Sequence, residues 1–190
     1  MLHILSIALL LRLHDFAGAP PPVLHKAERE LARVYDTIGV HVEWDHAAQH
    51  ADERAALHVI LVAHEGGDLR RTRDSVMAAT LWTARGTPVV YVFYRRVEAE
   101  AVRNGVSVDL VLACALAHEV GHVLMPEHGH SQEGLMRARW GQDDFHRADQ
   151  GQLRFSADEA ALIGETVQSS AFKLQSAQNA ERRTRTNLEP

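Results

Sequence analysis

The pattern of apolar residues predicts two well-defined helices in this chain. In residues 23–38, apolar side chains recur every three or four positions with charges between them, the spacing that places them on one face of a helix. Gly39 follows this segment, where a glycine commonly ends a helix. The second helix is predicted over residues 110–124, a mostly apolar segment that Ser107 or Asp109 can cap.

Five shorter segments alternate apolar and polar residues or are almost continuously apolar, which is typical of strands. Residues 57–63 form a nearly unbroken apolar run that two glycines follow, as expected of a central strand, whereas residues 76–83 predict a short edge strand. Strands and helices that alternate along one chain predict an α+β fold with α/β-like features. The predicted strands are residues 9–16, 40–44, 57–63, 76–83 and 89–94.

A third helix is predicted near the end of the chain. Residues 156–159 have the sequence of a capping box, Ser-Ala-Asp-Glu, and the helix that they open runs to about Val167. The residues that follow are mostly polar and predict a flexible tail. We therefore expect a single domain over residues 1–167 and a polar C-terminal tail over residues 168–190.

The first residues have a second interpretation. Residues 4–11 could be the apolar core of a signal peptide, with Ala17-Gly18-Ala19 as its cleavage site. No Lys or Arg precedes the apolar run, and Arg12 and His14 interrupt it, so we favour a strand over residues 9–16. The localisation of this bacterial-type protein, whether secreted, periplasmic or cytoplasmic, therefore stays open.

Composition narrows the classes of partner. The chain has 190 residues, of which 46% are hydrophobic and 24% charged, as in an ordinary single domain. A net charge of −5 argues against a nucleic-acid partner, and no segment is apolar over the length that stable membrane insertion needs. We expect a monomer.

Cys114 is the single cysteine, and we expect it to serve packing. The 13 histidines are unusually many for a chain of this length and favour metal binding.

The candidate chemistry lies on the second predicted helix. His118 and His122 are four residues apart, so their imidazoles project from the same face, and Glu119 lies beside them where it can act on a water molecule. In a chain with 13 histidines this H-E-x-x-H pattern could arise by chance roughly once in twenty. Its place on an apolar helix, where these side chains would be costly to bury alone, favours a metal site. His128 and His130 follow as further candidate ligands.

Residues 118–128, with the sequence HEVGHVLMPEH, resemble the zinc signature of the metzincin peptidases, in which a third histidine follows the second by six residues. That histidine is His128. Gly134-Leu135-Met136 resembles the Met-turn of the same clan, in which the methionine lies under the metal site. The chain departs from the signature at Met125, where the clan has a glycine because the backbone turns sharply.

The likeness is closer to a group of small bacterial matrixin-like proteins of mostly unassigned role, and it covers roughly residues 9–167. In that group the recurrent third histidine corresponds to His130. Two histidines, His130 and His128, therefore compete for one coordination position, and the closer resemblance favours His130.

The resemblance implies a zinc metallopeptidase with a zincin-like twisted mixed sheet, a backing helix, an active-site helix and a C-terminal helix. It implies one catalytic Zn²⁺ held by His118, His122 and the third histidine, with Glu119 as general base and Met136 as a structural residue. A peptide or protein substrate would lie along a sheet edge at residues 89–94 or 76–83. The alternatives are a non-catalytic zinc-binding domain of zincin fold and a His-rich interaction protein.

Other candidate residues have simpler explanations. Arg137 and Trp140 follow the Met-turn, but a surface arginine and a core tryptophan account for them. A carboxylate ligand from the final helix, such as Glu159 or Glu165, has no supporting sequence motif. Five histidines without metal-ligand spacing are expected to be solvated, namely His41, His46, His50, His58 and His64.

Overall fold

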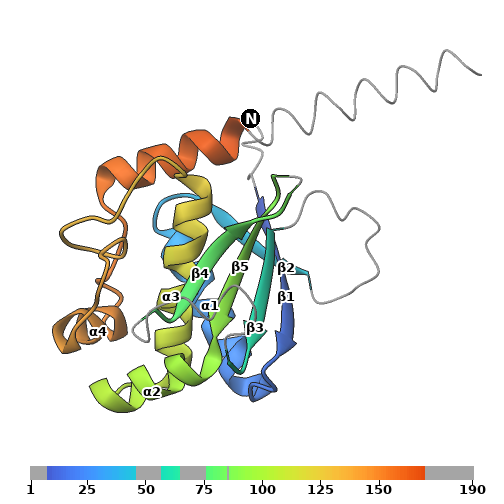
Figure 1. Ribbon diagram of the computed structural model, residues 1–190. Coiled ribbons are helices and arrows are strands. Elements are labelled where there is room, and N and C mark those ends of the chain that lie inside the picture. Colours follow the sequence, from blue (N-terminus) through green and yellow to red (C-terminus); the bar gives the residue numbers. More distant parts are fainter. Residues whose placement is uncertain (1–7, 46–56, 65–75, 85, 170–190) are drawn as a thin grey trace, which may run out of the picture.

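The computed structural model describes residues 8–45, 57–64, 76–84 and 86–169 (Figure 1). These residues form a five-stranded sheet with the strand order β2-β1-β3-β5-β4. Strands β1, β2, β3 and β5 are parallel, whereas β4 runs antiparallel to β5 at one edge. The strands are β1 (Ala8–Phe16), β2 (His41–Asp45), β3 (Leu57–Val62), β4 (Ala78–Trp82) and β5 (Pro88–Phe93).

All five predicted strands are confirmed, with ends that differ by no more than two residues. The segment expected to be central, β3, lies in the middle of the sheet, and the segment expected at an edge, β4, lies at an edge. The strand interpretation of residues 9–16 is also confirmed, since β1 pairs with β2 on one side and with β3 on the other.

Five helices accompany the sheet in the described part of the chain, which gives the α+β class that the sequence predicts. The labelled helices are α1 (Pro21–Asp36), α2 (Tyr94–Asn104), α3 (Val108–Leu124) and α4 (Gln142–Asp149), and a last helix covers residues 157–169. Ser107 caps α3, as one of its two predicted candidates. The capping box of the last helix is formed, because Ser156 and Glu159 each accept a hydrogen bond from the other's backbone N–H group. No helix among the described residues is long and apolar enough to cross a membrane.

Two helices, α2 and α4, were not predicted. In α2, only Tyr94, Val97 and Ala101 are buried, and the exposed positions are rich in charge, so the apolar pattern is short and weak. In α4, the only apolar residues that are buried are Phe145 and Ala148, in a segment otherwise polar. Tertiary packing, rather than a strong apolar pattern of their own, stabilises such short helices.

The main core lies between one face of the sheet and the helices α1 and α3 (Figure 1). Alternate residues of the central strands point into it, and Leu11, Val59 and Val90 are fully buried. Helix α3 is buried along almost its whole length, because α4 and the segment after α3 cover the side turned away from the sheet. The Tyr35 hydroxyl of α1 donates a hydrogen bond to the carbonyl oxygen of Ala117 at 3.0 Å. These contacts hold α3 rigidly at the centre of the molecule.

Candidate metal centre

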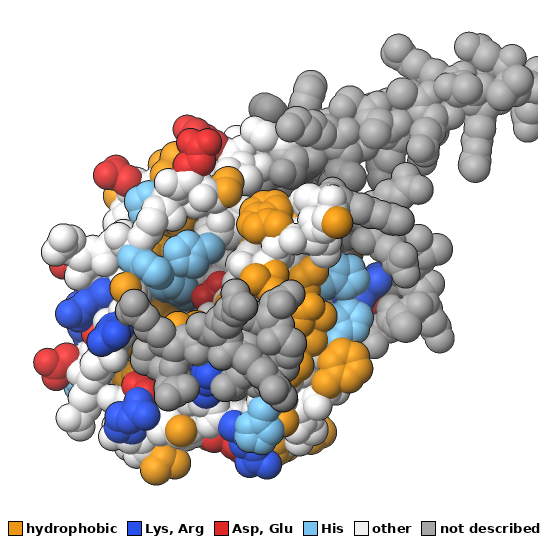
Figure 2. Space-filling model, in the orientation of Figure 1, with side chains coloured by type: hydrophobic (Ala, Val, Ile, Leu, Met, Phe, Trp, Pro, Cys, Tyr) orange, Lys and Arg blue, Asp and Glu red, His pale blue; other side chains and the backbone are white. Residues whose placement is uncertain are grey.

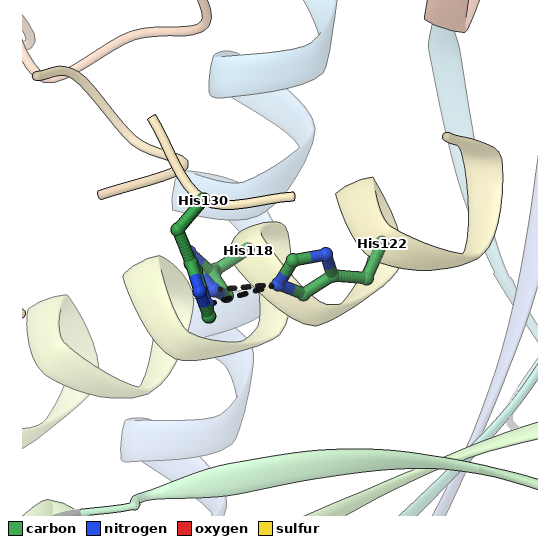
Figure 3. A group of neighbouring side chains, drawn as sticks. All are labelled: His118, His122 and His130. Atoms are coloured by element: carbon green, nitrogen blue, oxygen red, sulfur yellow. Dashed lines mark hydrogen bonds between the residues drawn. The ribbon is translucent and has the colours of Figure 1, made fainter. Parts of the chain in front are cut away.

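Helix α3 brings His118 and His122 together on successive turns. The two Nε2 atoms are 3.0 Å apart, and the rings meet edge to face with centroids 4.6 Å apart (Figure 3). His118 is buried and His122 is half-buried, so the pair lies where the helix approaches the surface. Figure 2 shows a group of histidine side chains on the surface in this part of the molecule.

The third imidazole belongs to His130, from the segment that follows α3. Its Nε2 lies 3.3 Å from the Nε2 of His122, and its ring stacks on that of His118 with centroids 5.2 Å apart. All three ligand nitrogens lie within 4.8 Å of one another (Figure 3). Of the two candidates for the third ligand, His130 belongs to the cluster. His128 lies outside it and contacts Ser131 and Glu159 instead.

The path of the chain at Met125 explains how it reaches His130. Met125 ends α3 with φ −129° and ψ 64°, a conformation with negative φ that needs no glycine. The N–H group of His128 then donates to the carbonyl oxygen of Met125 at 2.9 Å, which closes a turn. The glycine of the metzincin signature is therefore not required here, and the histidine that reaches the cluster comes two residues later than that signature has it.

Two of the spacings between the three nitrogens fit a tetrahedral metal ion, and all three nitrogens lie within 4.8 Å of one another. Zinc binds histidine nitrogen at about 2.0–2.1 Å, and tetrahedral angles then place neighbouring nitrogens about 3.3 Å apart. The His118–His122 and His122–His130 distances, 3.0 and 3.3 Å, are close to that value. Three imidazole nitrogens are the ligand set of one common type of catalytic zinc site, which leaves a fourth position open.

A hydrogen bond also leaves the Nε2 atom of His118 free to face the cluster. His118 Nδ1 lies 2.9 Å from the carbonyl oxygen of Leu135, which can only accept, so the proton is on Nδ1 and the lone pair on Nε2 faces the cluster. The pKa of His118 is lowered to about 4, mainly by burial and also by the neighbouring His122 and His130, whereas the hydrogen bond to Leu135 opposes the shift. Burial and the proximity of His130 likewise lower the pKa of His122. Both rings are therefore neutral at pH 7, the form that binds a metal.

The segment Gly134-Leu135-Met136 forms a tight turn against α3. Gly134 has φ +77°, and the N–H group of Leu135 donates to the carbonyl oxygen of Arg154 at 2.9 Å. Met136 is fully buried, and a Cβ atom at Gly121 would lie 2.7 Å from its sulfur. Gly121, between the two histidine positions, therefore lets Met136 pack directly against the helix.

Glu119 is buried and turns toward the sheet edge. The hydroxyl of Thr80, in the middle of β4, donates a hydrogen bond to its Oε2 at 2.9 Å. Burial raises the pKa of Glu119, and the hydrogen bond from Thr80 opposes that shift. Thr80 was not singled out from the sequence, because only the register of β4 against β5 places it opposite Glu119.

A second buried carboxylate, Glu159, supports the segment that carries His130. Glu159 is 1% exposed, receives hydrogen bonds from the Ser131 hydroxyl and the Ser156 N–H group, and lies 3.4 Å from the Nε2 of His128. Burial raises the pKa of Glu159, but these hydrogen bonds together bring it below its ordinary value. The sequence identified Glu159 as a capping residue and not as the partner of Ser131.

The remaining candidates are placed as follows. Arg137 lies on the surface, as predicted, and pairs with Asp144 at 2.9 Å. Trp140 is half-buried, and its ring meets the ring of His118 edge to face with centroids 5.4 Å apart. Cys114 is buried, which agrees with a packing role.

The scattered histidines do not share one environment. His41 and His64 are exposed, as expected. His58 differs from the prediction, because its Nδ1 lies 2.9 Å from the Nε2 of His14 on the neighbouring strand. The other two, His46 and His50, lie outside the described residues.

No model of a known protein family matches this chain, and no curated protein matches it.

Proposed function

We propose that the protein is a zinc-dependent peptidase of zincin type. The observation that carries the proposal is the convergence of His118, His122 and His130 at the spacing of zinc ligands, on the helix that also bears Glu119. The mixed sheet, with an antiparallel edge strand beside α3 and a further helix at the end of the chain, supports the zincin interpretation.

Zinc at these histidines would lower the pKa of a water molecule toward neutrality and polarise the scissile carbonyl group. Glu119 would accept the proton of the attacking water and pass it to the amine that leaves. Its carboxylate suits this role because Oε2 is held by Thr80, whereas Oε1 accepts no hydrogen bond from the residues that the structure describes.

Strand β4 supplies a place for an extended peptide. It lies at the edge of the sheet, so the backbone groups on its outer side can pair with an added strand. Its hydrogen bond to Glu119 through Thr80 brings this edge next to the candidate catalytic residue. Leu81 and Trp82, at the end of the same strand, are large apolar side chains that remain exposed, which favours contact with a partner.

The proposal is tested with zinc-loaded protein, an unstructured protein substrate such as labelled casein, and the Glu119→Gln variant. We expect wild type to cleave the substrate and Glu119→Gln to lose activity by about 10²-fold or more while it keeps its zinc. His122→Ala is the matched control, since it should lose both zinc and activity. Zinc-loaded wild type that cleaves neither casein nor a mixed peptide library would overturn the proposal and leave a non-catalytic zinc-binding domain.

A further inference from the structure

The contact between Thr80 and Glu119 joins the edge strand to the proposed general base. Thr80 lies in the centre of β4, paired in register with Val90 of β5. Its Oγ1 is 2.9 Å from Oε2 of Glu119 and 3.4 Å from the main-chain oxygen of the same residue. The hydroxyl carries one hydrogen, and the shorter distance and the negative charge both favour donation to the carboxylate.

We propose that Thr80 is a positioning residue that fixes the orientation of the Glu119 carboxylate during proton transfer. This inference rests on the proposed peptidase function. A glutamate side chain turns about several bonds, whereas threonine is β-branched and stiff about its first. In β4, the backbone of Thr80 is itself held by the pairing with β5, so its hydroxyl is a fixed donor.

The hydrogen bond is compatible with both protonation states of Glu119. Before the reaction, Oε2 accepts from Thr80 and Oε1 is available to a water molecule. When the water's proton arrives on Oε1, Oε2 becomes the carbonyl oxygen of a carboxylic acid and still accepts the same hydrogen bond. When the proton leaves for the amine, the negative charge returns to Glu119. Thr80 neither gains nor loses a proton in this sequence.

Thr80 also lies on the strand to which an extended substrate would add. A peptide paired with β4 would lie beside the strand whose Thr80 hydroxyl orients Glu119. A threonine that only satisfied a buried carboxylate would affect stability and leave the chemical step unchanged.

Two substitutions separate these roles, because each removes one part of the side chain. Thr80→Val keeps the shape and removes the hydroxyl, whereas Thr80→Ser keeps the hydroxyl and removes the methyl group. We expect kcat on a fluorogenic peptide to fall about 10- to 100-fold in Thr80→Val, with KM and zinc content changed by less than about threefold. Thr80→Ser should retain kcat within about threefold of wild type. In the Glu119→Gln background, Thr80→Val should not lower the residual rate further.

The measurements are made on zinc-loaded proteins at a temperature below the unfolding transition of every variant. Wild-type kcat in Thr80→Val would overturn the inference and leave the proposed function intact. Equal losses in Thr80→Val and Thr80→Ser would also overturn it, since packing would then account for both. A wild-type protein that binds zinc but has no turnover would overturn the proposed function and this inference with it.

Discussion

The backbone conformation of Gly134 and a neighbouring carbonyl oxygen both disfavour a side chain at this position. Its φ of +77° is in the left-handed region, and a Cβ atom would lie 2.8 Å from the carbonyl oxygen of Arg154, which is backbone and cannot turn away. That same oxygen accepts the hydrogen bond of the Leu135 N–H group. Gly134→Ala should therefore displace Leu135, whose carbonyl oxygen fixes the ring of His118.

The size of the effect follows from these contacts. A left-handed conformation costs an alanine about 1–2 kcal/mol, and loss of the Leu135 hydrogen bond costs about 0.5–1.5 kcal/mol more. We expect Gly134→Ala to lower the free energy of unfolding by about 2–3 kcal/mol. Partners that orient a metal-binding histidine are typically worth about 10- to 100-fold in metal affinity, so zinc binding should weaken by that factor.

The matched control is Gly129→Ala, in the same segment. Gly129 is exposed, does not have a positive φ, and its added Cβ would meet no atom within 4 Å. Guanidinium unfolding of the metal-free proteins measures the stability difference, and zinc titration against a chelator measures affinity. If Gly134→Ala matched Gly129→Ala in both measurements, the turn at residues 134–136 would not orient His118 as described.

Three further predictions concern buried groups. The folded pKa of His118, about 4, lies below its ordinary 6.5, so the unfolded chain binds the proton more tightly between these values. His118 should therefore contribute a loss of about 2 kcal/mol in the stability of the metal-free protein, or roughly 4–8 °C of Tm, on going from pH 7 to pH 5. A His118→Gln variant with the same pH dependence as wild type would refute this. Burial raises the pKa of Cys114 to about 12, so its thiol should react with Ellman's reagent only after unfolding, and rapid reaction in the native protein would refute this. Glu159→Ala should release Ser131 and weaken zinc binding about 10-fold. Asp158 is exposed in the same helical turn, so Asp158→Ala should bind zinc like wild type. Equal zinc affinities in the two variants would contradict this.

The sequence predicted most of the sheet because the apolar pattern of each strand reflects its burial. Residues 57–63 are nearly all apolar and contain the central β3, and residues 89–94 are β-branched and aromatic and contain most of β5. One difference is Tyr94, which begins α2 instead of ending the strand. Helix α2 has its clearest sequence signals in the four-residue spacing of Val97 and Ala101 and in Gly105, which caps it with φ +67°.

Local spacing alone predicts only part of the candidate site. His118, Glu119 and His122 share one helix, so helix geometry alone brings the two imidazoles together. The choice between His128 and His130 depends on the path of a loop held by Ser131 and Glu159, which lie 28 residues apart in sequence. The contact of Thr80 with Glu119 spans 39 residues and depends on strand register. No periodic pattern encodes contacts of this kind.

The central claim is that three histidines, His118, His122 and His130, hold one zinc ion, and metal content tests it most directly. Protein purified without added zinc is compared by elemental analysis with the variants His122→Ala, His130→Ala and His128→Ala. We predict about one zinc per chain in wild type and in His128→Ala, and loss of the metal in the other two variants. Zinc that is retained in His130→Ala but lost in His128→Ala would contradict the geometry of the site. A wild-type protein that binds no zinc even after reconstitution would contradict the claim itself.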